Sequence, residues 1–93
     1  MTDKKQVRAR ITGVVQGVSF RYATQRTANA HGVTGWVRNM PDGAVEAVFQ
    51  GDANDVDTVL NWCWTGPSFA RVDDVFTKEE TVEEEFSSFR ISY

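Results

Sequence analysis

A glycine-bearing segment near the N-terminus has the residue types of an anion-binding loop. It comprises residues 13–21, GVVQGVSFR, between a strand predicted over Val7–Val15 and a helix predicted over Phe20–His31. Unpaired backbone N–H groups at the start of a helix bind anions, and Arg21 falls in that first turn. Because the turn carries no Asp or Glu, no side chain offsets its positive charge. The segment therefore predicts a site for an anion.

A second polar residue, Asn39, is expected at the same edge of the sheet. The strands Val7–Val15 and Thr34–Asn39 are joined through a helix, so they run parallel and end on the same side. In the split form of this unit another strand lies between them, which separates the two ends by roughly 10 Å. Side chains of Arg21 and Asn39 could then reach one small ligand. Taken singly, Arg21 also fits a solvated residue beside a turn relieved by Gly17, and Asn39 fits a turn cap.

The remaining elements complete an α+β pattern. They are a hairpin turn at 40–43, a strand over 44–50, a helix from 51–52 to the stop at 66–67, a strand over 70–76 and a short strand over 89–93. The order βαββαβ with an extra terminal strand predicts a ferredoxin-like sandwich, with a mixed sheet and two helices on one face. Val72 and Val75 break the alternation of the fourth strand and predict a β-bulge.

The second predicted helix carries an apolar stripe. Its members, at the spacing of a buried face, are Val56, Val59, Leu60, Cys63 and Trp64. Outside the regular elements, residues 1–6 are expected to be a frayed end and residues 79–85 a solvated acidic loop. The whole chain, 1–93, is expected to form a single domain because its length leaves no room for two cores.

Composition and charge exclude several classes of function. A net charge of −3 argues against a nucleic-acid binder, which usually has a basic face. No apolar stretch approaches the roughly 20 residues of a membrane span, and the N-terminus lacks a signal-peptide core. One cysteine and one histidine allow no internal disulfide and leave no thiolate or His-based metal site. We expect a cytoplasmic monomer that needs no metal or other cofactor and binds neither nucleic acid nor membranes.

Two long segments resemble the signature motifs of the acylphosphatase family. They are Ile11–Arg21, ITGVVQGVSFR, and Gly35–Glu46, GWVRNMPDGAVE, and the likeness continues through Gln50-Gly51 and Gly66-Pro67 to Phe89–Tyr93. Members of this family are small ferredoxin-like enzymes that hydrolyse the carboxyl–phosphate bond of acyl phosphates without a metal. The resemblance implies that Arg21 binds the phosphoryl group and that Asn39 orients the attacking water. Ser92 stands where many members have a basic residue, a position expected to lie far from both motifs.

The chemistry of such a substrate suits the residues that the sequence offers. The carboxylate leaving group has a pKa of about 4, so its departure needs little help from a general acid. Arg21 offers a planar fork of donors that matches phosphoryl oxygens. Asn39 can bind a water but cannot act as its base near neutral pH, so the proton leaves late or passes to a phosphoryl oxygen. The rest of the phosphate cradle would be the backbone N–H groups of Gln16, Gly17, Val18, Ser19 and Phe20.

Inorganic phosphate, the product, should compete with the acyl phosphate for this cradle.

Ser19 could be a nucleophile, but helix N-capping explains it better because no base lies nearby in the sequence. His31 is expected to cap or flank a helix end, and Cys63 to lie in the core. Two other functions stay open: a non-catalytic module that binds a phosphorylated or carbamoylated group such as carbamoyl phosphate, and a ferredoxin-like RNA-binding domain.

Overall fold

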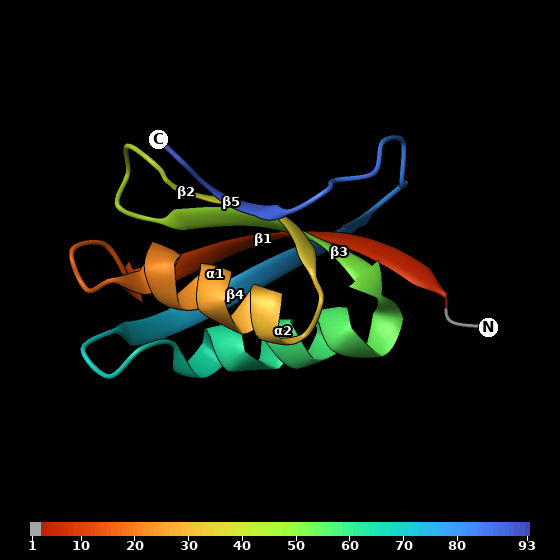
Figure 1. Ribbon diagram of the computed structural model, residues 1–93. Coiled ribbons are helices and arrows are strands. Elements are labelled where there is room, and N and C mark those ends of the chain that lie inside the picture. The colour runs from red at the N-terminus through yellow and green to blue at the C-terminus, as the bar shows by residue number, and fades with distance from the viewer. Residues whose placement is uncertain (1–2) are drawn as a thin grey trace.

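The computed structural model describes residues 3–93, which form two helices against one face of a five-stranded sheet (Figure 1). The elements in chain order are β1 (Lys4–Val14), α1 (Phe20–Ala30), β2 (Thr34–Asn39), β3 (Val45–Asp52), α2 (Ala53–Thr65), β4 (Arg71–Glu80) and β5 (Phe89–Ser92). The strand order is β4-β1-β3-β2-β5, with β5 parallel to β2 and the other pairs antiparallel. The predicted ferredoxin-like sandwich, with its mixed sheet and extra C-terminal strand, is confirmed.

The sheet order places the ends of β1 and β2 on either side of β3. Val45 of β3 pairs with Ile11 of β1 on one side and with Asn39 of β2 on the other. The loop after β1, the β2–β3 hairpin and the C-terminus consequently lie at the same end of the molecule, on the left in Figure 1. This arrangement is the one predicted for the two polar segments.

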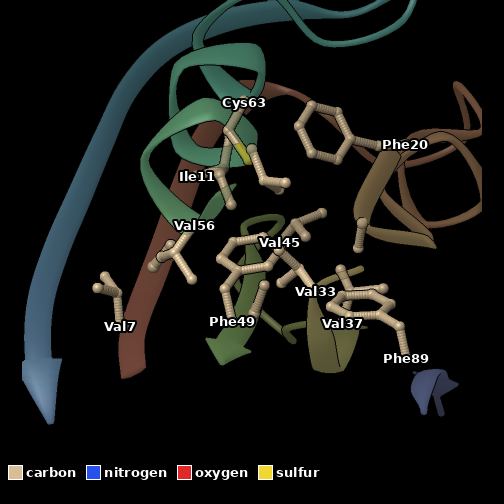
Figure 2. Packing of buried hydrophobic residues seen from close by; sticks show 14 of the residues in the cluster. Val7, Ile11, Phe20, Val33, Val37, Val45, Phe49, Val56, Cys63 and Phe89 are labelled. Carbon is tan, nitrogen blue, oxygen red and sulfur yellow. The ribbon is translucent and has the colours of Figure 1, made fainter. Parts of the chain in front are cut away.

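The core lies between the sheet and the two helices. Helix α1 packs on β2 and β5, and α2 packs on β1, β3 and β4. Figure 2 shows Phe20, from the start of α1, directed toward Cys63 of α2 above the side chains of the sheet. Phe49 and Phe89 stack within the same cluster, with ring centroids 5.6 Å apart. Burial of these apolar groups is the main force that holds the helices on the sheet.

The apolar stripe of α2 is confirmed except at its last member. Val56, Val59 and Cys63 are fully buried and Leu60 is partly buried, whereas Trp64 is 51% exposed. At 100° per residue, position 64 lies about 80° round the helix from Val56. Its side chain therefore leaves the face that packs on the sheet.

The end of α1 and the start of α2 lie close to the positions that the sequence predicts. Helix α1 stops at Ala30, one residue before the predicted end, and Gly32 follows with φ of +68°. The backbone N–H of Val33 donates to the carbonyl of Ala28 at 2.8 Å, which closes a Schellman-type turn that glycine accommodates without strain. Helix α2 is capped by Asp52, whose carboxylate accepts from the backbone N–H of Asn54.

Two predicted loops are shorter than expected because strands extend into them. Residues 4–6 were expected to be frayed, but they pair with β3 as the start of β1; residues 1–2 lie outside the described residues. Glu79 and Glu80 belong to β4 and not to the acidic loop. Gln6 and Arg8 both donate to the carboxylate of Glu80, at 3.0 and 2.8 Å. These cross-strand bonds between β1 and β4 therefore stabilise polar residues within regular strands.

The predicted β-bulge is present beside the end of β1. The register passes from Thr12 opposite Asp74 to Gly13 opposite Val72, which leaves Asp73 as the extra residue of β4. A Cβ on Gly13, whose φ is +124°, would lie 2.1 Å from the carbonyl oxygen of Arg71. Glycine thus permits the close approach of β4 just where the chain leaves the sheet for the loop.

The face of the sheet without helices carries charged pairs around Trp36. The guanidinium carbons of Arg8 and Arg38 lie 5.5 and 5.0 Å from the ring of Trp36. Arg38 also pairs with Glu46 at 2.7 Å, and Arg8 pairs with both Glu46 and Glu80. The charges of Arg8 and Arg38 are therefore balanced by carboxylates. Within residues 3–93, no helix is both long and apolar enough to cross a membrane.

Candidate active site

Arg21 and Asn39 line the same surface hollow at the end of the sheet where β1 and β2 finish. The hollow has a volume of about 510 Å³. Its other lining residues are Val15, Gly17, Ser19, Phe20, Tyr22, Ile91 and Tyr93. The structure thus brings together the cation, the amide and part of the glycine loop that the sequence singled out. It does so because the split topology brings the two strand ends to one edge of the sheet.

The loop between β1 and α1 has a backbone that few residues adopt. Gly17 has φ of +76°, and Ser19 has φ of +64°, the one positive φ of a residue other than glycine in the described chain. Such a left-handed conformation costs roughly 1–3 kcal/mol and persists where the surroundings enforce it, often at functional sites. Ser19 occupies the N-cap position of α1, but its hydroxyl makes no capping bond. The capping prediction is therefore correct in position and wrong in mechanism.

The same conformation leaves donors free at the start of α1. Across residues 3–93, the backbone N–H groups of Gln16, Gly17, Val18 and Ser19 donate to no protein acceptor. The first bond after the loop runs from the N–H of Ala23 to the carbonyl of Ser19, at 3.0 Å. Free N–H groups that precede a helix, together with the positive end of its dipole, form a binding site for an anion.

Phe20 fixes the start of the helix. Its side chain is 1% exposed, and its ring centroid lies 5.6 Å from that of Trp62 on α2. The hydroxyl of Thr24 donates to the carbonyl of Phe20, one turn further along α1. Because Phe20 is held on both its side chain and its backbone, the adjacent Arg21 starts from a fixed point at the rim of the hollow.

The guanidinium of Arg21 keeps its charge free of carboxylates. Arg8, Arg10, Arg38 and Arg71 all form ion pairs, but Arg21 forms none with any described residue. Its guanidinium carbon lies 4.8 Å from the ring of Tyr93, which holds the side chain by a cation–π contact. A half-buried arginine without a carboxylate partner leaves its donors for an incoming anion.

Asn39 is half-buried at the last position of β2, and its side-chain amide bonds to no other described residue. The turn that follows is capped instead by Asp42, whose carboxylate accepts from the N–H of Ala44 at 3.1 Å. The pKa of Asp42 is lowered below its usual value, mainly by a hydrogen bond from Arg10 and next by the bond from this backbone N–H. The alternative that Asn39 caps the turn is therefore wrong, and its amide is available at the hollow.

Three features of the site were not found from the sequence. The aromatic residues Tyr22 and Tyr93 line the hollow. The side-chain amide of Gln16 donates hydrogen bonds to the β2–β3 hairpin. Ser92 was expected to lie far from both motifs, yet it pairs with Arg38 of β2. The alternation of Phe89, Ile91 and Tyr93 is a usable signal for the face of β5. Its parallel pairing with β2, which brings Ile91 and Tyr93 to the hollow, has no local signal.

The other candidate residues lie away from the hollow. His31 is the exposed C-cap residue of α1, as predicted. Cys63 lies in the core as predicted, and burial raises its pKa to about 12. In the described part of the chain, no three His, Cys, Asp or Glu side chains are grouped so that they could hold a metal ion.

Comparison with known proteins agrees with the fold and with the family that the two motifs resemble. The family model for acylphosphatase matches residues 7–91. An acylphosphatase from Syntrophobacter fumaroxidans is 46% identical over 98% of this chain and 94% of its own length. One from Rubrobacter xylanophilus is 54% identical over 82% of this chain and 69% of its own. The crystal structure of acylphosphatase from Bacillus subtilis superposes with a TM-score of 0.93, at 35% identity, over 96% of this chain and 99% of that chain.

Fold and hollow together define a small α+β domain with a cation, free backbone donors and an amide at one end of its sheet. The family model and the relatives identify the family to which this domain belongs. The chain belongs to the acylphosphatase family, and it is an enzyme of that class.

Proposed function

We propose that this protein hydrolyses the carboxyl–phosphate bond of small acyl phosphates, with Arg21 and the backbone of residues 16–20 holding the phosphoryl group and Asn39 orienting the attacking water. The observation that carries the proposal is the shared hollow. It combines an arginine without a carboxylate partner, free backbone donors and an amide without a partner among the described residues. This combination fits a phosphoryl group on one side and a polar water on the other.

The proposed step is an in-line displacement at phosphorus. The water oxygen forms a bond to phosphorus while the bond from phosphorus to the bridging oxygen breaks, and its electron pair leaves with the carboxylate. Charge on the three phosphoryl oxygens is held by the guanidinium fork of Arg21 and the loop N–H groups. The amide of Asn39 holds the water, and the water's proton ends on the phosphate product, directly or through a phosphoryl oxygen.

The chemistry needs neither a general acid nor a metal ion in this proposal. The carboxylate leaving group has a pKa of about 4, so it departs as the anion without protonation. Positioning and charge stabilisation are then the main tasks, and both belong to Arg21, Asn39 and the loop. The proposal includes the expectations of a monomeric, cytoplasmic enzyme without a cofactor.

The direct test measures phosphate released from acetyl phosphate by the purified protein in excess chelator. Turnover should persist, inorganic phosphate should inhibit competitively, and a simple alkyl phosphate should not be cleaved because its leaving group is poor. A module that only binds phosphorylated or carbamoylated groups would show phosphate binding without turnover. Activity restored only by added Mg²⁺ or Zn²⁺ would refute the metal-free mechanism.

A further inference from the structure

The side chain of Gln16 joins the glycine loop to the hairpin that follows Asn39. Its amide nitrogen, Nε2, donates to the carbonyl of Met40 at 2.7 Å and to the carbonyl of Ala44 at 2.9 Å. A side-chain amide has two N–H donors, so both are used in this bridge. Both bonds are part-buried, and they connect segments 24 and 28 residues apart in the chain.

The bridge reaches the hairpin at the point where its own bonds close. The N–H of Met40 donates to the carbonyl of Ala44 at 2.8 Å, and the N–H of Gly43 donates to the carbonyl of Met40 at 3.1 Å. Each carbonyl thus accepts one bond from the turn and one from Gln16. The hairpin keeps these two bonds of its own if the glutamine amide is removed, but each of their acceptor carbonyls loses its second partner. That loss should let the hairpin open more often and shift relative to the loop, without unfolding the protein.

The two ends of the bridge are next to the two proposed functional groups. Met40 directly follows Asn39, and Gln16 begins the run of free backbone donors that leads to Arg21. No residue of β3, the strand that separates β1 from β2, lines the hollow between them. The bridge from Gln16 is therefore the direct link between the loop and the hairpin at this end, whereas the ion pair of Arg10 and Asp42 joins the hairpin to β1 and not to the loop.

We propose that the side chain of Gln16 is a positioning residue that sets the distance between the phosphate cradle and the water held by Asn39. This inference rests on the function proposed above. It assigns to Gln16 a role separate from its backbone N–H, which belongs to the cradle. A misplacement of about 1 Å between reacting groups can lower a rate by about a hundredfold, so a loosened bridge should act on turnover more than on phosphate binding.

A double-mutant cycle tests the inference. Gln16→Met keeps the length of the side chain and removes both donors, and we expect kcat to fall about 10–100-fold with the inhibition constant of phosphate changed less than about threefold. In a background of Asn39→Ala the same substitution should have almost no further effect on kcat, because the group that it positions is already absent. Equal fold losses in the two backgrounds would overturn the proposal.

Gln6→Met provides the matched control. The amide of Gln6 is also part-buried and makes two side-chain bonds, to Glu80 and from Gln50, but at the opposite end of β1. It should leave kcat unchanged in both backgrounds. If Gln6→Met lowers kcat as much as Gln16→Met does, general loosening of the sheet explains the effect and the positioning role is rejected.

Hydrogen exchange supplies a readout that does not need turnover. In the wild-type protein and in Gln16→Met, exchange of the Gly43 and Met40 amides reports how firmly the hairpin is held. Faster exchange in Gln16→Met, but not in Gln6→Met, supports the bridge even if the protein hydrolyses no acyl phosphate, which is the failure of the proposed function. Unchanged exchange in Gln16→Met overturns the inference while the proposed function stands.

Discussion

Replacement of Arg21 with glutamine should abolish most of the activity and leave the fold intact. In the proposed mechanism the fork of Arg21 makes two charge-assisted bonds to phosphoryl oxygens, each worth about 1.5–3 kcal/mol. Their sum, about 3–6 kcal/mol, corresponds to a fall in kcat/KM of about 10²–10⁴, at about 1.4 kcal/mol for each factor of ten. Arg21 is the one cationic side chain among the described residues that line the hollow, so no neighbour replaces it there.

The free energy of unfolding should change little in the same variant. The charge of Arg21 opposes the dipole of α1 at a cost of about 0.3–1 kcal/mol, which the substitution removes. The substitution also removes the cation–π contact with Tyr93, worth about 0.5–1 kcal/mol because that ring is exposed. These terms are opposite in sign and similar in size, so the urea midpoint should stay close to that of the wild type.

The assay measures both kcat/KM for acetyl phosphate and the urea midpoint in three variants: Arg21→Gln, Arg21→Lys and Arg26→Gln. Arg26→Gln is the matched control, since Arg26 lies on the same helix and also stacks on a tyrosine, Tyr22, at 5.9 Å, but does not line the hollow. Arg21→Lys keeps the charge without the planar fork, and its kcat/KM should still fall by more than about tenfold. Near-wild-type kcat/KM in Arg21→Gln, or equal losses in Arg21→Gln and Arg26→Gln, would refute the reasoning.

Three further outcomes are expected. Gly35→Ala should destabilise the protein by about 2–4 kcal/mol in urea unfolding, because Gly35 has φ of +136° and its new Cβ would lie 1.8 Å from the carbonyl oxygen of Val48; an unchanged midpoint would contradict this. Cys63, whose pKa burial raises to about 12, should resist iodoacetamide at pH 8 and react only in the unfolded protein. The hydrogen bond from Arg8 is the largest of the effects that lower the pKa of Glu80. The stability that ionised Glu80 contributes is therefore complete above about pH 4.3, and it is lost as the pH falls through the lower folded-state pKa. Glu80→Gln should therefore lose less stability than the wild type between pH 7 and pH 3, as measured by urea midpoints.

The fold could be predicted because its signals are local. Glycines and a proline mark the turns, and Asp52, Gly32 and Gly66 stand where the helices begin or end. Strand boundaries were less certain because pairing with neighbours overrides local polarity. The start of β1 at Lys4 and the extension of β4 to Glu80 are of this kind, since both gain partners across the sheet.

The parts of the site that follow from chain topology could be predicted from the sequence. A strand–helix–strand unit requires that the segments of Arg21 and Asn39 end at one edge, and they do line one hollow. Contacts of Tyr93 with Arg21 and of Gln16 with the hairpin depend on which strands become neighbours and on side-chain direction. Neither is encoded in periodicity, so the sequence identified the two motifs but not the side chains that hold them in place.

The most direct test of the proposed mechanism is one substitution, Asn39→Ala, followed by kcat, the inhibition constant of phosphate and the urea midpoint. If Asn39 orients the water, kcat should fall by about a hundredfold or more, while the phosphate constant stays within about threefold because Arg21 and the loop still hold the anion. The urea midpoint should hardly move, since the amide of Asn39 makes no bond within residues 3–93 and Asp42 caps the turn. A variant that hydrolyses acetyl phosphate at close to the wild-type rate would contradict the account.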